Sequence, residues 1–197
     1  MDAFHLDRHQ KKARQLNAWL VFLDESGFLM APLVRRSWAP RGQTPLLLQR
    51  GVHHQKVSVI AVLCLRGDER RFYFRLYPNA DVSARQVIPF LRYLDRELAG
   101  PWLLLWDRLN AHRARRTTQF LATRCYPQAH FLPAYAPDLN PVEYAWCYLK
   151  TNPLANAPHF DLPALTCSTR RHARALQRKT ALLDSFLSHS PLFLSST

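Results

Sequence analysis

The sequence predicts one mixed α/β domain in which a central sheet is covered by helices on both faces. Short apolar runs typical of buried strands come first along the chain, and strand-like runs then alternate with segments of helical periodicity. With 197 residues, of which 48% are hydrophobic, the chain is long enough to bury one sizeable core. The composition therefore argues against disorder of the whole chain.

The first elements follow from abrupt changes in hydropathy. Residues 1–17 are polar and basic, and we interpret them as a linker that enters a strand at residues 19–23. A second extended segment is expected at residues 33–38, before Pro40 and Gly42 interrupt the pattern.

The remaining strands are indicated by alternating side chains and by turn residues. Residues 57–65 alternate with β-branched residues, and a turn at Gly67 leads to a further strand at residues 71–77. The unbroken apolar run at residues 102–106 suits the buried centre of a sheet. A short strand is expected at residues 129–132.

Four helices are expected from the spacing of apolar residues and from helix-start signals. Residues 83–98 repeat apolar side chains at helical spacing, although Pro89 falls in their first turns. Residues 111–124 form a second expected helix, and a third begins near Pro141. A last, basic helix is expected at residues 161–178.

The charge balance favours a polyanionic partner. Lys and Arg outnumber Asp and Glu by 27 to 14, for a formal net charge of +13, so nucleic acid is the first candidate and solubility alone is the alternative. The basic residues are scattered, which disfavours a membrane surface, and no stretch approaches the roughly 20 apolar residues of a membrane span. The N-terminal segment lacks a signal-peptide core, so we expect a cytosolic protein, and a nucleic-acid partner would associate it with the nucleoid.

Two acidic residues directly follow apolar runs. Asp24 comes after the run at residues 19–23, and Asp107 comes after the run at residues 102–106. A carboxylate at the end of a central strand is rigidly held and suits a hard metal ion. For either residue alone, a strand-end turn or a helix cap is the competing interpretation.

Glu143 is the third candidate acid. Asn140 as N-cap and Pro141 as first helical residue would give Glu143 a capping-box role, but its position near the positive helix end also favours an ionised metal ligand. Glu25 follows Asp24 directly, and strand alternation directs it to the opposite face, so we do not expect it to be a ligand.

Three ordered motifs join these acids: FLDESGF at 22–28, LLWDRLNAH at 104–112 and LPAYAPDLNPVEYAWCYLK at 132–150. They resemble the catalytic motifs of bacterial insertion-sequence transposases of the mariner superfamily, as do WAPRGQTP at 38–45 and LAN at 154–156. The resemblance implies a ribonuclease H-like fold and an aspartate, aspartate, glutamate triad. That triad maps here onto Asp24, Asp107 and Glu143.

The resemblance also implies how the chain is organised. We expect a basic linker remnant at residues 1–17, a catalytic domain at 18–152, and a basic helical extension at 153–197 packed on the same domain. The family's helix-turn-helix region, which recognises the element's inverted repeats, is not expected within this sequence. The sequence is then either a truncated copy or the second reading frame of a split element, whose helix-turn-helix part is encoded separately. DNA, as element ends and as target, is the expected partner, and a homodimer is expected during transposition.

The implied activity is cut-and-paste transposition, in which DNA is cleaved and its end is joined to a target. Three carboxylates are expected to hold two Mg²⁺ or Mn²⁺ ions, because oxygen ligands suit these metals. Asn110 and His112 match positions of the second motif and are expected to orient the metal ligands or to contact phosphate. An ordinary helix-start residue is the alternative for His112.

DNA-binding residues are expected among the basic side chains near the motifs and toward the C-terminus. These are Arg108, Arg113, Arg115, Arg116, Lys150, Arg170, Arg171 and Arg174. A solvated helix face is the alternative for each cluster. Trp38, Tyr135 and Tyr144 are candidates for stacking on unpaired bases, with core packing as the alternative.

Two other functions remain open from the sequence. A nuclease of the same fold would use the same acids to cut nucleic acid without joining it. A degenerate, non-catalytic DNA-binding remnant is the second alternative, although all three acids are present.

Overall fold

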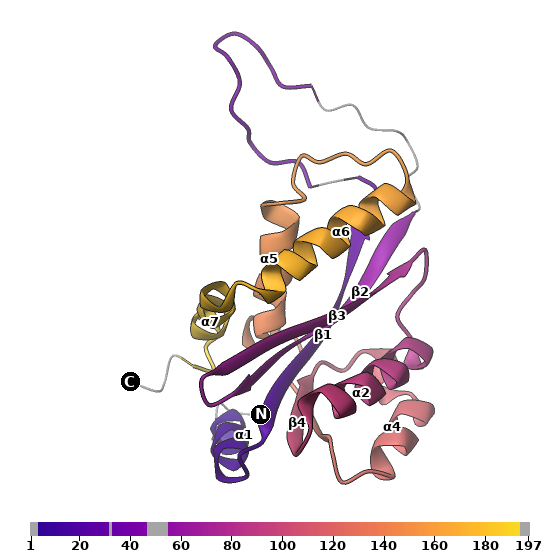
Figure 1. The fold of residues 1–197 in the computed structure, drawn as a ribbon, viewed down its shortest axis with the longest axis vertical. Helices are drawn as coiled ribbons and strands as arrows, with labels where there is room; N and C mark the ends of the chain where they lie inside the picture. Colours follow the sequence, from indigo (N-terminus) through magenta and orange to yellow (C-terminus); the bar gives the residue numbers. More distant parts are fainter. Residues whose placement is uncertain (1–3, 32, 47–54, 194–197) are drawn as a thin grey trace.

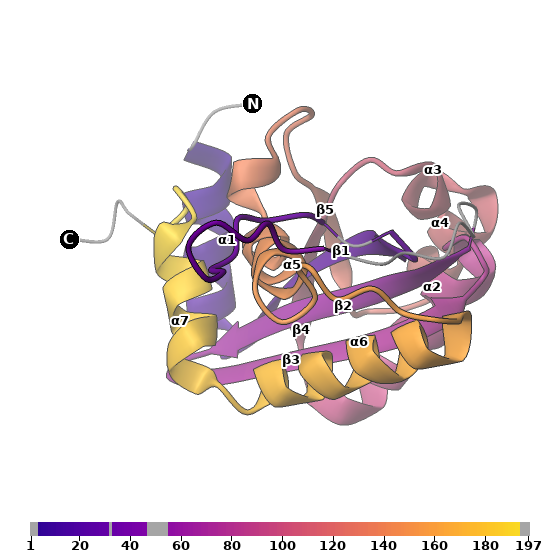
Figure 2. The same ribbon diagram turned by 90° about the horizontal axis from the view of Figure 1, so that it is seen from above.

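The computed structural model describes residues 4–31, 33–46 and 55–193. Its centre is a five-stranded sheet with strand order β3-β2-β1-β4-β5. Helices lie on both faces of this sheet (Figure 1, Figure 2). The predicted fold class, a mixed sheet flanked by helices, is confirmed.

The sheet combines an antiparallel meander with two parallel strands. The strands are β1 Trp19–Leu29, β2 Lys56–Arg66, β3 Glu69–Pro78, β4 Trp102–Trp106 and β5 Gln128–Phe131. β1, β2 and β3 pair antiparallel, whereas β4 pairs parallel with β1 on its other side and β5 parallel with β4. Because β1 and β4 are parallel, residues just beyond their paired segments emerge side by side at one end of the sheet.

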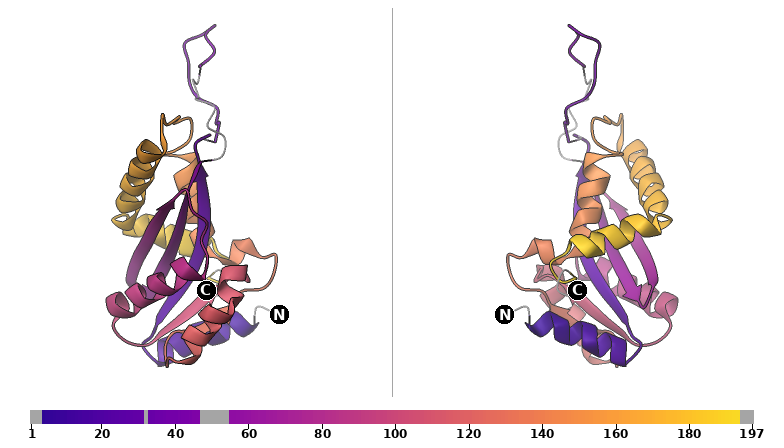
Figure 3. Two further views of the ribbon diagram at one scale, coloured as in Figure 1. Left: turned by 90° about the vertical axis from the view of Figure 1, so that its right-hand side faces the viewer. Right: turned by 90° about the vertical axis from the view of Figure 1, so that its left-hand side faces the viewer.

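Alternating side chains of the strands build two separate cores. Leu20 and Phe22 of β1 contribute to the core on one face, where Val142, Trp146 and other helical side chains cover them. Trp19, Val21 and Leu23 contribute to the core on the other face. Figure 3 shows the sheet between these two helical layers.

The helices divide between the two faces. The helices are α1 Phe4–Gln15, α2 Ala84–Leu98, α3 Asn110–Arg113, α4 Arg115–Ala122, α5 Pro141–Thr151, α6 Leu162–Gln177 and α7 Thr180–His189. α2, α3 and α4 cover the face of Leu23, whereas α5, α6 and α7 cover the face of Phe22. Pro89 lies inside α2, where a proline removes one backbone hydrogen bond of the helix, and a full capping box at Ser83 fixes the helix start. No helix within the described ranges is both long and apolar enough to span a bilayer.

Three local expectations differ from the structure. Residues 4–15, which were interpreted as part of a linker, form helix α1, whose Ala13 is buried and whose Gln10 side chain donates to the Leu192 carbonyl at 2.9 Å. The expected helix at residues 111–124 breaks into α3 and α4 because Ala114 adopts an extended backbone (φ −58°, ψ 138°).

The third difference concerns residues 33–46, which we call the arm. Residues 33–38 were expected to be extended sheet, but the described arm contains no strand and extends away from the sheet (Figure 1). Asn156 holds the base of the arm by hydrogen bonds. Its backbone N–H donates to Leu33 O, and its side chain accepts from Arg35 N at 2.8 Å and donates to Arg35 O at 2.9 Å. Trp38 is fully exposed, so the arm lacks the neighbouring strand and the buried face that a sheet requires.

Candidate active site

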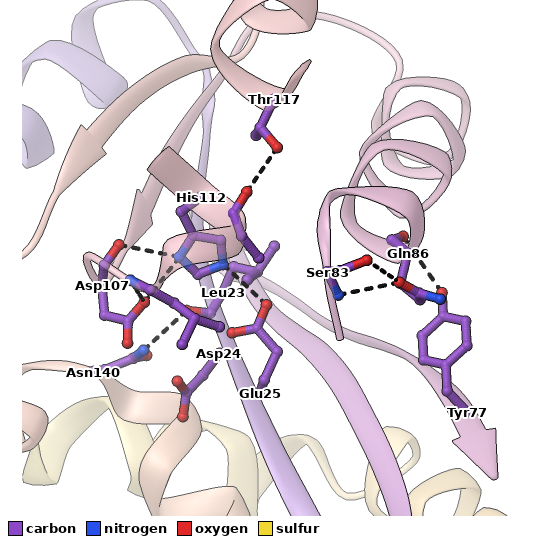
Figure 4. Close-up of polar contacts among 12 residues, drawn as sticks. Leu23, Asp24, Glu25, Tyr77, Ser83, Gln86, Asp107, His112, Thr117 and Asn140 are labelled. Atoms are coloured by element: carbon purple, nitrogen blue, oxygen red, sulfur yellow. Dashed lines mark hydrogen bonds and ion pairs between the residues drawn. The ribbon is translucent and has the colours of Figure 1, made fainter. Parts of the chain in front are cut away.

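The parallel pairing of β1 and β4 brings two acidic residues together. Phe22 pairs with Leu105, so Asp24 and Asp107 lie two residues further along these neighbouring strands and share the face covered by α5. Asp24 lies within β1 and is only 7% exposed, whereas Asp107 follows the last residue of β4 and its side chain is 53% exposed. The two acids therefore lie near one another where β4 ends beside β1 (Figure 4).

Helix α5 brings the third acid to this end of the sheet. The buried Asn140 side chain accepts from Val142 N at 3.2 Å and donates to Leu23 O at 3.0 Å, which ties the start of α5 to β1 beside Asp24. The capping box considered for Glu143 is not formed, because the Asn140 backbone N–H donates to Pro137 O at 2.8 Å. The Glu143 carboxylate is therefore not used to cap its own helix.

All three acids line one cleft of about 490 Å³. Its other walls include Asn140, Arg108 and the loop at residues 132–137. The loop is anchored by buried Leu132, whose N–H donates to Trp106 O at 2.7 Å, and it carries Tyr135 at φ +58° with a fully exposed ring. The cleft thus combines carboxylates, one guanidinium and an exposed aromatic rim.

The acids repel one another within this cleft. Burial, followed by the charges of Glu143 and Glu25, raises the pKa of Asp24 to about 8, although the Trp146 indole N–H donates to its Oδ2 at 2.8 Å. Burial also raises the pKa of Glu143, and the charge of Asp107 adds to this effect while Lys150 opposes it. A divalent cation would relieve this repulsion, and carboxylate oxygens are the donors that Mg²⁺ and Mn²⁺ prefer, so the donor set fits such a metal.

His112 lies between Asp107 and Glu25 with both ring nitrogens engaged. Its Nδ1 is 2.8 Å from Asp107 Oδ1 and its Nε2 is 2.9 Å from Glu25 Oε1. The fully buried ring also stacks on Trp106, with centroids 4.2 Å apart. Burial opposes protonation, but the hydrogen bonds to Asp107 and Glu25 prevail and raise the pKa of His112 to about 9.

Asp107 is held by two donors on one oxygen. Its Oδ1 accepts from Leu109 N at 2.9 Å as well as lying against the His112 ring. Partial burial acts against ionisation, yet these two hydrogen bonds lower the pKa of Asp107 below its ordinary value. Asp107 is therefore a carboxylate whose second oxygen makes no hydrogen bond to the described residues.

Glu25 is the residue that the sequence interpretation missed. Alternation correctly directs it away from Asp24, but on that face it meets His112, and ligand atoms of Glu25, Asp107 and His112 lie within 4.8 Å of one another. The signal lay in the second motif, because the short helix α3, which starts at Asn110, turns His112 back toward β1. Asn110, the other supporting candidate, lies exposed at the start of α3 and forms no hydrogen bond to the acids in the described structure.

The basic candidates lie at different distances from the cleft. Arg108 lines it, with its guanidinium 5.5 Å from the Phe131 ring centroid, and Lys150 is close enough to influence Glu143. Exposed side chains on α3 and α4 follow the second motif: Arg113, Arg115 and Arg116. The α6 set is also exposed, but α6 packs on β2 and β3, away from the acids: Arg170, Arg171 and Arg174.

The aromatic candidates separate into exposed and packed side chains. Tyr135 at the cleft and Trp38 in the arm are fully exposed. Tyr144 instead packs against the core, and its hydroxyl donates to His189 O at 3.1 Å. Core packing is therefore the better interpretation for Tyr144.

Comparison with known proteins places the fold. The family model described as DDE superfamily endonuclease matches residues 19–166, whereas no curated protein matches the chain. The catalytic domain of Mos1 mariner transposase superposes with a TM-score of 0.60 at 16% identity, over 97% of this chain and 85% of that chain. This match confirms the expected ribonuclease H-like fold.

Larger Mos1 assemblies are similar to the chain over part of their length. The mariner Mos1 paired end complex with Mg gives a TM-score of 0.66 at 19% identity, over 97% of this chain and 57% of that chain. The Mos1 transposase paired-end complex with left transposon end gives 0.58 at 20% identity, over 96% and 60%. The chain thus spans no more than about 60% of the Mos1 chains in these complexes.

Proposed function

Because the chain belongs to the DDE superfamily endonucleases, we propose that it is the catalytic part of a cut-and-paste DNA transposase. The observation that carries this proposal is the convergence of Asp24, Asp107 and Glu143 on one cleft from two strands and a helix. We assign them as the catalytic, metal-holding acids. The fold shared with Mos1 structures that contain transposon ends, Mg or Mn supports this assignment.

The mariner resemblance also suggests the type of element, its DNA substrates and the number of copies that act together. The element is a bacterial insertion sequence, its ends and its target are the DNA substrates, and two copies of the chain act together in the cell's DNA-containing cytosol. End recognition belongs to a helix-turn-helix part. The Mos1 strand transfer complex, whose fold is similar with a TM-score of 0.60, supports joining as well as cutting.

The residues of the cleft have different proposed roles in phosphodiester cleavage. Asp24, Asp107 and Glu143 would hold two Mg²⁺ or Mn²⁺ ions, which supply charge neutralisation at the attacking and leaving oxygens and activation of the nucleophile. Trp146 fixes one oxygen of Asp24, and the donors on Asp107 Oδ1 leave its other oxygen available.

Further side chains bind and orient the DNA. Arg108 contacts the backbone phosphates beside the acids, because it lines the same cleft and no carboxylate of the described residues forms a salt bridge with it. Tyr135 stacks on an unpaired base at the cleft rim, since its ring is fully exposed and a sequence-tolerant stacking contact suits any base.

The decisive experiment replaces each acid by its amide. Asp24→Asn, Asp107→Asn and Glu143→Gln should each abolish Mg²⁺-dependent cleavage of an element-end duplex while preserving the circular dichroism spectrum. Asp68→Asn, in the exposed β2–β3 turn, is the matched control and should cleave like the parent. Parent-level cleavage in any one of the three variants would remove that residue from the proposed site.

A joining assay separates the proposal from a nuclease of the same fold. A pre-cut element end with a free 3′-hydroxyl is incubated with a target plasmid, and joined products are expected with the parent but not with Asp107→Asn. Cleavage without joined products would favour the simple nuclease. Absence of both activities, with DNA binding retained, would favour a non-catalytic remnant.

A further inference from the structure

We propose that Glu25 is a positioning residue that fixes the orientation of the Asp107 carboxylate through His112. The juxtaposition of Glu25, His112 and Asp107 carries this inference (Figure 4). It rests on the proposed role of Asp107 as a metal ligand. In this role Glu25 acts through His112 and is not itself a metal ligand.

The hydrogen-bond partners of His112 determine what its ring can do. Nε2 faces Glu25 Oε1 at 2.9 Å, while Nδ1 faces both Asp107 Oδ1 at 2.8 Å and Asp107 O at 3.1 Å. These oxygens accept hydrogen bonds, so each ring nitrogen must present a hydrogen to them. A ring with both nitrogens donating has no lone pair for a metal, and His112 therefore links two acids instead of joining a metal site with them.

Glu25 sets the orientation of the His112 ring. Without a partner on Nε2, the buried ring could turn about its Cβ–Cγ bond and present a carbon to Asp107, since stacking on Trp106 holds only the plane of the ring. The Glu25 bond selects the orientation that points Nδ1 at Asp107. Outer partners of this kind, which fix a histidine or carboxylate at a metal site, commonly govern metal affinity.

Both ends of this connection are rigidly placed. Glu25 belongs to β1, pairs with Ile60 of the neighbouring strand, and its side chain is only 10% exposed. His112 sits on the short helix α3, which the buried Thr117 hydroxyl ties to α4 by a 2.7 Å bond to Ala111 O. The connection thus runs from β1 through α3 to the residue that follows β4.

Three substitutions of Glu25 distinguish positioning from charge and from metal ligation. Glu25→Ala removes the partner of Nε2. Glu25→Gln keeps a group of the same length that can still hydrogen bond to Nε2, whereas Glu25→Asp keeps the charge but is too short to reach it. Glu97→Ala, which removes an exposed acid at the end of α2, is the matched control.

The primary measurement is Mn²⁺ affinity of the full chain without DNA. Glu25→Ala and Glu25→Asp should each weaken Mn²⁺ binding by about 10–100-fold, and Glu25→Gln should stay much closer to the parent. Nitrogen-15 NMR of the His112 ring should show a changed hydrogen-bonding state in Glu25→Ala and Glu25→Asp. Glu97→Ala should change neither the affinity nor the spectrum, and melting temperatures identify any variant that fails to fold.

Each outcome bears on a different claim. Equal losses in Glu25→Gln and Glu25→Ala would show that the carboxylate itself binds metal, which overturns the positioning role. Parent-like affinity in Glu25→Ala, together with weakened binding in Asp107→Asn, would overturn this inference and leave the proposed function standing. Parent-like Mn²⁺ binding in Asp107→Asn would instead overturn the role of Asp107 on which both depend.

Discussion

Asp24 carries a carboxyl group in surroundings that oppose its charge. It is almost fully buried, and the neighbouring acids Glu143 and Glu25 raise its pKa further, to about 8. The metal-free protein therefore keeps Asp24 protonated near neutral pH. A cation that binds to this carboxylate must displace the proton, so metal binding should strengthen as pH rises toward 8.

This environment predicts a pH-dependent cost in stability. The pKa of Asp24 is higher in the folded than in the unfolded protein. The free energy of unfolding therefore contains the full contribution of the Asp24 carboxyl group below the ordinary pKa of 3.8, and this contribution is lost as pH rises through about 8. Asp24→Asn removes that loss, and metal-free Asp24→Asn should exceed the parent in stability near pH 8 by on the order of a few kcal/mol, at about 1.4 kcal/mol per pKa unit. Thermal denaturation in EDTA across this pH range measures the difference.

Two comparisons test this interpretation of Asp24. The raised pKa of His112 also makes stability fall as pH rises, between its ordinary pKa of 6.5 and about 9. His112 is present in both proteins, so the difference between their curves of stability against pH reports on Asp24 alone. Mg²⁺ should stabilise the parent most at the high-pH end and Asp24→Asn much less. Parallel curves for the two proteins would contradict the assigned pKa shift.

At the scale of elements, the start of α5 determines where Glu143 lies. The Asn140 side chain bonds to Val142 N at the start of α5 and to Leu23 O of β1, and the Trp146–Asp24 hydrogen bond joins the same two elements further along the helix. The helix therefore cannot shift along the sheet without breaking a buried hydrogen bond. The geometry of the cleft depends on this amide.

Asn140→Ala should destabilise the protein by about 1–3 kcal/mol, because a helix cap is lost and the buried Leu23 carbonyl is left without its partner. Cleavage should fall more than DNA affinity, since Glu143 moves while the basic surface remains. Urea denaturation and turnover kinetics measure the two effects. Asn152→Ala, at the exposed C-cap of the same helix, is the control and should change neither by a comparable amount.

Asn156 predicts a second element-scale effect, on the arm. Asn156→Ala removes two hydrogen bonds to the backbone of Arg35, each worth about 0.5–1.5 kcal/mol, and should speed tryptic cleavage within the arm severalfold. The cleavage sites are Arg35, Arg36 and Arg41. Mass spectrometry of timed digests locates the cuts, and unchanged rates would show that the arm base opens independently of Asn156.

The sequence identified the strands that carry the acids because each is an uninterrupted apolar run. Residues 19–23 and 102–106 lie in β1 and β4 as expected, and their acids follow directly. Helix α1 was missed because its sequence is mostly polar and its burial depends on contacts with distant residues such as Leu192.

Contacts between side chains of different helices and strands could not be predicted from the sequence pattern. Alternation gave the correct face for Glu25, yet only the three-dimensional path of α3 places His112 on that face. The extended segment expected at residues 33–38 forms no strand, because the types of its side chains cannot supply a neighbouring strand to pair with. The roles of the site residues stay predictions until the substitutions are made.

At the scale of the whole molecule, the net charge of +13 predicts DNA binding dominated by phosphate contacts. Duplex affinity should fall by orders of magnitude between about 50 and 200 mM salt if roughly six or more phosphates are neutralised. Replacing the α3–α4 set by Gln should lower the slope of log affinity against log salt by up to about 3, at roughly 0.9 per phosphate. This set is Arg113, Arg115 and Arg116.

The arginines of α6 provide the matched comparison, because they are equal in number and are also exposed, but lie on a helix that packs on β2 and β3. Their replacement by Gln should change the slope less. The set is Arg170, Arg171 and Arg174. A larger effect from α6 would mean that the DNA runs across that helix and not along α3 and α4.

The hydrogen bonds that hold α5 against β1 also determine how late during translation the cleft can form. Asn140 bonds to Leu23, which lies 117 positions earlier, and Trp146 bonds to Asp24, which lies 122 positions earlier. The β1–β3 meander instead pairs strands that follow one another in the sequence. A chain emerging from the ribosome can pair β2 with β3 long before α5 is made, and contacts between residues so far apart form late. A nascent or prematurely terminated chain would therefore carry part of the basic surface proposed to bind DNA while lacking the assembled cleft of three acids.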